Sequence, residues 1–463
     1  MERRASYHRA INYFFDYNHT PLPRAIKTAC LLLEHLSKSF SVRESNKSTV
    51  TNWFSLLPFA FCLFTFALII MSLFPLLVRS LHGVRPGCRL GGGRNIVITF
   101  LLLNLVFFTS LCMPSARSEE RLALSQPFMA KWQYETEETV DFTPAVRDGT
   151  IYVPFSSGQI VSLNGDDGEL IWKSETGGHI SASPVADEKA LFVASESGKA
   201  NSGFRSQSKG VVRALSLNSG LTMWERILPL PLRGALTSDL RNVYGAGRDG
   251  RVYAINKLTG DILWTKHFGE PFEFRPVNNN DLLFLGNMKG DMYALDKKTG
   301  AINWRYRTRG ALRGSASIFN SKVYFGSADN HVYALDARRG QLLWRVRTGA
   351  EVQSVVHTPA GVLVASLDNF VYFLSPDDGG RLWKRQLAGR ISAQPLVTAD
   401  EALLTPLTGD ACIVLDLKDG KLLNKLTVGD DNNTSASPVT AGGLLFITTR
   451  RGLLAFANQT SGP

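Results

Sequence analysis

The chain of 463 residues is poor in cysteine: it has five, and only Cys412 lies beyond residue 118. A single thiol can form neither an intrachain disulfide nor a CxxC metal site, so residues 119–463 are not a disulfide-stapled or zinc-ribbon domain. The sequence also lacks a Gly-rich phosphate loop opening a helix, and it lacks a GxSxG nucleophile elbow. These absences exclude P-loop enzymes and α/β-hydrolases.

An excess of one charge is also absent from most of the chain. The formal net charge is +11, but residues 1–118 hold 13 Lys and Arg against 4 Asp and Glu, whereas residues 119–463 hold 38 against 36. A nearly neutral body has no long-range basic field that would gather nucleic acid. We therefore expect no nucleic-acid partner.

Long apolar runs are confined to the first 118 residues, at 53–78 and 96–113. Each is about long enough to cross a bilayer, which takes roughly 20 apolar residues. The segment between them carries four arginines and no acidic residue, so the positive-inside rule keeps it cytoplasmic and sends the following chain across the membrane. Residues 119–463 are therefore expected to be exported, to the periplasm or the periplasmic face of a cell envelope.

The second run also has the pattern of a signal peptide, with Ala116 and Ser118 before a cleavage ahead of Glu119. Two interpretations of the preceding residues stay open. Either they form a real extension whose segment 53–78 adds a membrane span, or residues 1–83 come from a start codon placed too far upstream. The second is favoured because residues 1–52 show no coherent periodicity. The expected organisation is an extension at 1–95, a signal peptide or membrane anchor at 96–118, and one domain at 119–463.

A repeat of about 40 residues fills that domain. Three copies are "GRVYAINKLTGDILW" at 250–264, "GDMYALDKKTGAINW" at 290–304 and "NHVYALDARRGQLLW" at 330–344. Several short strands per repeat at this period predict an all-β propeller. Asn424 stands where an eighth Trp would be, which predicts eight blades. The chain ends without a last Trp strand, so we expect residues 130–136 to complete the last blade and close the ring.

The repeat resembles that of the pyrroloquinoline-quinone-type propeller family. The resemblance implies that each repeat Trp docks between adjacent blades, at Trp132, Trp172, Trp224, Trp264, Trp304, Trp344 and Trp383. Dehydrogenases of this family hold a quinone and a Ca²⁺ over the propeller axis and commonly carry a vicinal Cys-Cys pair, which this sequence lacks. We expect no catalytic, metal or cofactor-binding residues and no enzymatic activity. The alternatives are a quinoprotein dehydrogenase and a membrane-anchored sensor or adhesion propeller.

Other chemically active side chains follow the repeat or have no pattern. Asp296, Asp336 and Asp416 lie in the repeat turn, where a carboxylate accepts local backbone N–H groups. Four histidines share no spacing and are expected to be structural or solvated: His179, His267, His331 and His357. A Gly- and Ser-rich excursion at 195–210 is expected to be a tolerated surface loop.

One connection, "LPLPLRGAL" at 228–236, differs from the others in having three leucines and two prolines before Arg233. The prolines fix φ, so Leu228, Leu230 and Leu232 are expected to be presented at low entropic cost beside the arginine. The ninth residue after each Trp should ring one opening of the central funnel, with Arg275 nearby: Asp141, Ser181, Arg233, Glu273, Arg313, Gln353 and Ser392.

The same stretch, "LPLRGALTS", resembles the Leu-x-Leu-Arg-Gly connection of the propeller subunits of the bacterial outer-membrane barrel assembly machinery, the BamB family. The resemblance implies a non-catalytic scaffold whose partner is the central barrel-assembly subunit, bound through Leu230, Leu232 and Arg233. The alternative that Leu230 and Leu232 only pack under the connection stays open. Two features depart from the family. Leu111 before Cys112 makes a poor lipidation site, and "ALRGSAS" at 311–317 is a second, partial copy of the motif.

Overall fold

The computed structural model describes residues 122–197, 208–391, 393–406, 411–429 and 434–459, which belong to one compact unit, Ser115–Pro463. Within these ranges the chain forms strands and turns, and no helix there could cross a membrane. The apolar runs at 53–78 and 96–113, and the expected signal peptide, lie outside the described residues. The predicted all-β class is correct for the part of the chain that is described.

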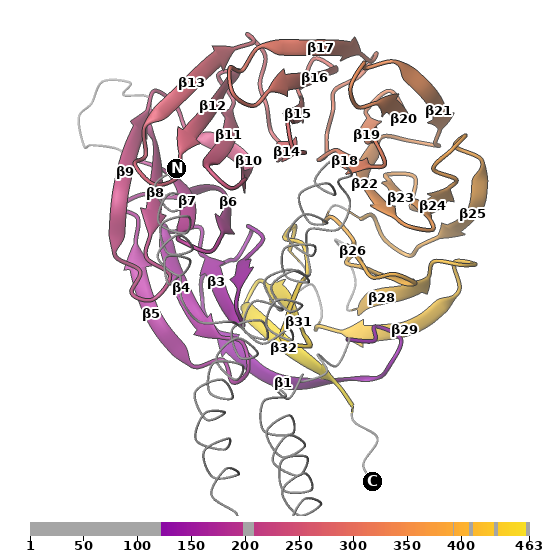
Figure 1. Cartoon of the computed structure of the whole chain (residues 1–463). Coiled ribbons are helices and arrows are strands. Elements are labelled where there is room, and N and C mark those ends of the chain that lie inside the picture. The colour runs from indigo at the N-terminus through magenta and orange to yellow at the C-terminus, as the bar shows by residue number, and fades with distance from the viewer. Residues whose placement is uncertain (1–121, 198–207, 392, 407–410, 430–433, 460–463) are drawn as a thin grey trace, which may run out of the picture. The chain divides into compact units, whose positions relative to one another are not determined.

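The described residues contain 32 strands in seven sheets, six of them four-stranded (Figure 1). The first two sheets of four consecutive strands are β2 (Ala145–Arg147), β3 (Thr150–Pro154), β4 (Gln159–Asn164) and β5 (Leu170–Glu175), then β14 (Val277–Asn278), β15 (Leu282–Gly286), β16 (Asp291–Asp296) and β17 (Ile302–Arg307). The next two are β18 (Ser317–Phe319), β19 (Lys322–Ser327), β20 (His331–Asp336) and β21 (Leu342–Arg347), then β22 (Val352–Thr358), β23 (Gly361–Ser366), β24 (Phe370–Leu374) and β25 (Arg381–Gln386). The last is β26 (Leu396–Val397), β27 (Glu401–Leu404), β28 (Ala411–Asp416) and β29 (Leu422–Thr427).

Two sheets depart from this scheme. An eight-stranded sheet consists of two successive four-strand meanders, whose first strands, β6 and β10, pair in parallel at Ser183 and Ala235. Its strands are β6 (Ile180–Ala186), β7 (Leu191–Glu196), β8 (Gly210–Leu215), β9 (Thr222–Leu228), β10 (Leu232–Ser238), β11 (Asn242–Gly247), β12 (Arg251–Asn256) and β13 (Ile262–His267). The other sheet joins the two ends of the unit, because β1 (Phe128–Glu135) pairs with β32 (Gly452–Asn458), beside β31 (Leu444–Thr449) and β30 (Val439–Ala441).

The sheets are arranged in a ring with their first strands toward the centre and their fourth strands at the periphery (Figure 1). We call the peripheral ones the outer strands: β5, β9, β13, β17, β21, β25, β29 and β1. The middle strands are buried on both faces because a neighbouring sheet covers each face; in β16, for example, Tyr293, Ala294 and Leu295 are all buried. A continuous apolar run in such a strand is therefore consistent with its place in the fold.

Six of the seven repeat Trp residues fasten their sheet to the next one in the chain, and Trp224 joins the two meanders of the eight-stranded sheet. The indole Nε1 of Trp264 donates a hydrogen bond to the Lys297 carbonyl at 2.9 Å, and the other six make the equivalent bond at 2.7–3.2 Å. Asn424 does the same with its amide, which donates to the carbonyls of Leu124 and Gln126 at 3.2 and 2.7 Å. The residue that interrupts the Trp series therefore still fastens one sheet to the next segment.

The Gly four residues before each repeat Trp except Trp132 has two physical roles. Gly300 has a φ of +68°, which L side chains rarely adopt, and a Cβ there would lie 2.7 Å from the ring of Trp264. The turn thus needs a residue that tolerates positive φ and leaves room for the Trp of the preceding sheet. The first requirement concerns the turn of a single repeat, whereas the second needs two repeats in contact.

Candidate partner-binding site

The connection between β9 and β10 consists of Pro229, Leu230 and Pro231. Pro229 is exposed and Leu230 is half-buried, whereas Leu228 and Leu232 are each 1% exposed. The expectation that all three leucines are presented at the surface is therefore wrong for Leu228 and Leu232. Of the three leucines, Leu230 keeps surface that a partner could cover.

Leu232 is buried because β10 begins there and directs this side chain into the sheet. It packs in one hydrophobic cluster with Leu228, Leu236 and Phe192. Its Cδ1 fills the space beside Gly245 in β11, where an added Cβ would lie 2.5 Å away. Leu232 therefore holds the connection in place from below.

Arg233 is fixed by an acid at the end of β7. Its Nη2 lies 2.5 Å from Glu196 Oε1, and the second oxygen of the same carboxylate accepts a hydrogen bond from Ser208 Oγ at 3.2 Å. Arg233 and Glu196 are both partly buried, and the Nε of Arg233 is buried without a hydrogen-bond partner. A partly buried, paired guanidinium is held in one orientation, which lowers the entropic cost of using it in an interface.

The base of the 195–210 excursion lies against this connection. Gly210, the first residue of β8, is so close that an added Cβ would lie 2.4 Å from the carbonyl oxygen of Leu230. The excursion and the connection are separate in the sequence, where Leu230 lies 20 positions after Gly210. No local sequence pattern predicts the contact, because it depends on the antiparallel pairing of β8 with β9.

Gly234 lets the chain turn from this connection toward the centre of the ring. Its φ is +72°, and an added Cβ would lie 2.6 Å from the backbone carbon of Phe274. Its counterpart in the partial copy, Gly314, has no positive φ. The two Leu-Arg-Gly segments therefore differ in backbone conformation although their residues are the same.

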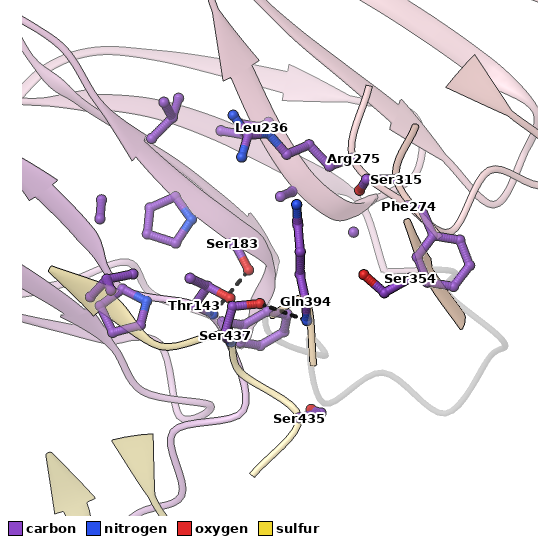
Figure 2. A pocket seen from close by; sticks show the side chains of 18 of the residues that line it. Thr143, Ser183, Leu236, Phe274, Arg275, Ser315, Ser354, Gln394, Ser435 and Ser437 are labelled. Carbon is purple, nitrogen blue, oxygen red and sulfur yellow. Dashed lines mark hydrogen bonds between the residues drawn. The ribbon is translucent and has the colours of Figure 1, made fainter. Parts of the chain in front are cut away.

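A cavity of about 860 Å³ lies at the centre of the ring, lined by residues at or before the first strand of each four-strand set (Figure 2). It confirms the predicted ring of ninth residues at Asp141, Ser181, Arg233, Glu273 and Gln353. The prediction is wrong for Arg313, because the next two residues, Gly314 and Ser315, line the cavity in its place. Ser392 lies outside the described residues.

Hydroxyl groups tie neighbouring inner segments together around this cavity. The backbone N–H of Thr143 donates to Ser183 Oγ at 3.1 Å, and that of Gln394 donates to Ser437 Oγ at 3.1 Å (Figure 2). The backbone N–H of Ser437 donates to Thr143 Oγ1 at 3.0 Å. These bonds satisfy backbone donors at the cavity wall, where strand pairing is absent. Ser183 and Ser437, which lie in the "SASPV" segments at 181–185 and 435–439, thus have a structural role.

The charged side chains that line the cavity differ in their hydrogen-bond and ion-pair partners. Glu273 accepts a hydrogen bond from Arg248 at 2.8 Å, and Asp141 accepts from the hydroxyls of Thr139 and Ser156. Arg275 extends into the cavity (Figure 2), and within the described residues its guanidinium forms no ion pair. The surrounding protein lowers the pKa of Arg275, yet arginine stays charged at neutral pH.

The remaining candidate residues lie apart from one another. In the repeat turns, Asp296 and Asp336 each accept two backbone N–H groups and Asp416 accepts one, as expected for structural carboxylates. His179, His267 and His331 each bond a nearby backbone carbonyl, and His357 stacks on Phe319. Burial raises the pKa of the Cys412 thiol to about 12. Among the described residues, no three His, Cys, Asp or Glu side chains are grouped closely enough to hold a metal ion.

Comparison with proteins of known sequence shows two kinds of relative. Residues 129–205, 208–321 and 308–463 match the family model described as outer membrane protein assembly factor BamB. A stretch of 182 residues is 22% identical to tetrathionate hydrolase of Acidithiobacillus ferrooxidans, and it covers 34% of this chain and 34% of the hydrolase. The match thus spans about a third of that relative's length.

Solved structures show the same fold at low identity. BamB from Moraxella catarrhalis is 18% identical with a TM-score of 0.52, covering 62% of this chain and 92% of its own. Quinohemoprotein alcohol dehydrogenase from Comamonas testosteroni is 12% identical with a TM-score of 0.58, and the match covers 74% of this chain and 78% of the dehydrogenase. The computationally designed Ika8 protein is 13% identical with a TM-score of 0.61, covering 71% and 98%. The fold is that of a β-propeller, and because the family model matches well over half of the chain, the protein belongs to the family of outer membrane protein assembly factor BamB.

Proposed function

We propose that the protein is a non-catalytic, extracytoplasmic scaffold that binds another protein, and that it acts as a BamB-like factor in outer-membrane protein assembly. The observation that carries this proposal is the β9–β10 connection, where an exposed Pro229 and a half-buried Leu230 stand next to Arg233, itself held by Glu196. A rigid apolar residue beside an oriented arginine is a typical interface anchor. The site of action is the periplasm or the periplasmic face of the envelope.

We further propose that the seven sheets make up eight blades. The eight-stranded sheet consists of two consecutive meanders of four strands, and β1 supplies the outer strand beside β30, β31 and β32. Closing the ring in this way leaves no unpaired end between the first and last blades, which protects the fold from edge-to-edge association.

The proposed mechanism is positional, because the ring makes and breaks no bond. Leu230 and Arg233 contact the partner, while Leu232 contributes from the core by fixing the connection. The partner is the central barrel-assembly subunit, whose periplasmic part the ring would hold in one orientation. Stiffening by two prolines reduces the entropy lost when the complex forms.

Capture from the native cell envelope tests this proposal. The tagged wild-type protein should retain the central barrel-assembly subunit, and the Leu230→Ala/Arg233→Ala variant should retain it about 30-fold less well, as the loss of a hot spot of about 2 kcal/mol implies. Arg313→Ala is the matched control, since this arginine belongs to the partial copy. If the wild-type protein brings down no barrel-assembly subunit, the proposed function is wrong; if the double variant captures normally, only the assigned site is wrong.

A second candidate, a quinone-dependent dehydrogenase, is suggested by the likeness to the quinohemoprotein and by the 860 Å³ cavity. Its Ca²⁺ would need six to eight oxygen ligands. The acids of the described cavity wall are engaged elsewhere, Glu273 with Arg248 and Asp141 with two hydroxyls. These donors do not fit such a centre. Quinone absorbance and Ca²⁺-dependent alcohol oxidation in the purified protein after reconstitution would nevertheless establish this candidate over the scaffold.

A further inference from the structure

The charge of the ring is unevenly distributed around it. Residues 122–197 hold 12 Asp and Glu against 4 Lys and Arg, whereas residues 302–390 hold 6 against 13. The first segment supplies β1 to β7 and the second supplies β17 to β25, which lie on opposite sides of the ring (Figure 1). A unit that is almost neutral as a whole therefore has an acidic side and a basic side.

The basic side presents its cations on three consecutive outer strands. Each of β17, β21 and β25 carries two exposed cations and no acidic residue. We call this set the basic rim: Arg305, Arg307, Arg345, Arg347, Arg381 and Lys384. Because the strands belong to successive sheets, the rim extends along the periphery as a row.

In the middle of the rim, the carboxylate of Asp329 accepts a hydrogen bond from the Tyr333 hydroxyl at 2.7 Å and does not pair with an arginine. Arg345 and Arg347 lie opposite Tyr333 and His331 in the β20–β21 ladder, and within the described residues neither arginine forms an ion pair. Arg305 and Arg307 differ, since both bind the carboxylate of Asp291, which is almost fully buried. Arg345 and Arg347 are thus the cations of the rim most available to an external anion.

Lys384 is positioned by aromatic rings. Its Nζ lies 3.6 Å from the ring centroid of Phe370 and 4.8 Å from that of Tyr372, while the side chain stays exposed. Cation–π contacts of this kind hold an ammonium group in place without neutralising its charge. The rim therefore keeps its positive charge toward the solvent at both β21 and β25.

We propose that the basic rim docks against an anionic lipid surface, so that the ring stands with its acidic side directed away from the bilayer. This inference rests on the proposed extracytoplasmic location next to a membrane. A bilayer fits because a plane of lipid phosphates meets cations from three outer strands at once, and each cation near such a surface improves partitioning about fivefold. Two apolar runs of bilayer-spanning length occur in the same chain, at 53–78 and 96–113.

This orientation leaves the β9–β10 connection free. Leu230 and Arg233 follow β9, which belongs neither to the acidic segment 122–197 nor to the basic segment 302–390. The lipid contact and the partner contact therefore use different parts of the ring and can be tested separately.

Vesicle co-sedimentation tests the proposal. The unit Ser115–Pro463 contains the hydrophobic clusters of the described residues and pairs its first strand with its last, so it can be produced without the apolar runs. At low salt it should bind phosphatidylcholine vesicles that contain phosphatidylglycerol and should not bind phosphatidylcholine alone. Arg345→Gln/Arg347→Gln should reduce partitioning onto the anionic vesicles about 30-fold, as two lost surface cations imply.

The matched control is Lys131→Gln/Lys173→Gln, which removes the same charge from exposed positions of two outer strands on the acidic side. This variant should partition onto anionic vesicles within about twofold of the wild-type value. Both variants should keep the wild-type unfolding midpoint. Equal losses in the two variants would mean that net charge, and not the rim, attracts lipid. If the protein shows no preference for anionic vesicles, the proposal is wrong and the rim binds no lipid. If it binds polyglutamate more tightly than vesicles and this binding depends on the rim, the proposal is wrong and the ligand is an acidic protein. Capture of the barrel-assembly subunit should be unaffected by Arg345→Gln/Arg347→Gln, which separates this test from that of the proposed function.

Discussion

Leu232 and Leu312 occupy equivalent places in two connections of the ring that share the sequence Leu-Arg-Gly. Both side chains are 1% exposed, and each packs beside a glycine of a second strand. Leu232 lies beside Gly245 of β11, in the meander that its connection enters, whereas Leu312 lies beside Gly286 of β15, in the sheet that its connection leaves; the added-Cβ distances are 2.5 and 2.6 Å. The buried leucine is thus a property of the repeat. Likeness of sequence between the two connections therefore says nothing about partner binding at this position.

The two connections differ in the residues around that leucine. Where the first has Leu230, the second has Gly310, and Arg233 is paired at 2.5 Å within a partly buried site while Arg313 approaches Glu351 only to 3.5 Å. Gly234 alone of the two glycines has a positive φ. The features that distinguish the first connection are the ones to which a specific role can be assigned.

The largest expected effect concerns the shared leucine. Leu232→Ala and Leu312→Ala should each lower the free energy of unfolding by about 2–5 kcal/mol, because each leaves a cavity in a packed cluster. Denaturant titration of the two variants measures this. A Leu232→Ala variant as stable as the wild type would mean that this side chain is free for a partner after all.

A smaller difference is expected at the two glycines. Both substitutions bring the new Cβ against backbone, at 2.6 Å from Phe274 for Gly234→Ala and at 2.5 Å from the Gln353 carbonyl oxygen for Gly314→Ala, but only Gly234→Ala also places a side chain at positive φ. The first substitution should be more destabilising by about 1–2 kcal/mol, the usual cost of the left-handed conformation. Equal unfolding midpoints would show that the connection relaxes to another backbone conformation.

Leu230→Ala should separate stability from binding. Leu230 is half-buried in the connection, so we expect a loss of at most about 1 kcal/mol in unfolding free energy, together with a clear loss of partner capture. Leu232→Met is a useful control, since it conserves core volume and should not change capture. Normal capture by Leu230→Ala would remove this residue from the interface.

The smallest effect is expected for the two arginines. A double-mutant cycle between Arg233 and Glu196 should give a coupling of about 1 kcal/mol, since both groups are partly buried at 2.5 Å. The more exposed Arg313 and Glu351 pair, at 3.5 Å, should give a coupling near zero. Similar values in the two cycles would show that Arg233 is not held more firmly than its counterpart.

The local pattern of the repeat predicted much of the fold. The turn aspartates lie where the sequence places them, because their role depends on residues a few positions apart. The same local dependence holds for the strands at the "YALD" segments and for the glycine before every repeat Trp except Trp132. The positions that ring the cavity could also be counted from each Trp, although Arg313 falls outside it. The burial of Leu228 and Leu232 was predicted wrongly, because composition suggested a surface anchor and only packing against Gly245 shows the core role of Leu232.

The sequence by itself determined that the chain forms an all-β repeat protein, since a Gly-Trp unit recurring about every 40 residues encodes the strands and the docking of one unit on the next. Only the tertiary structure decided which distant segments meet. It brings Glu196 to Arg233, Asn424 to the segment before β1, and the acidic segment 122–197 and the basic segment 302–390 to opposite sides of the ring. These relations depend on the curvature of the ring, which is a property of all the sheets together and of no single repeat.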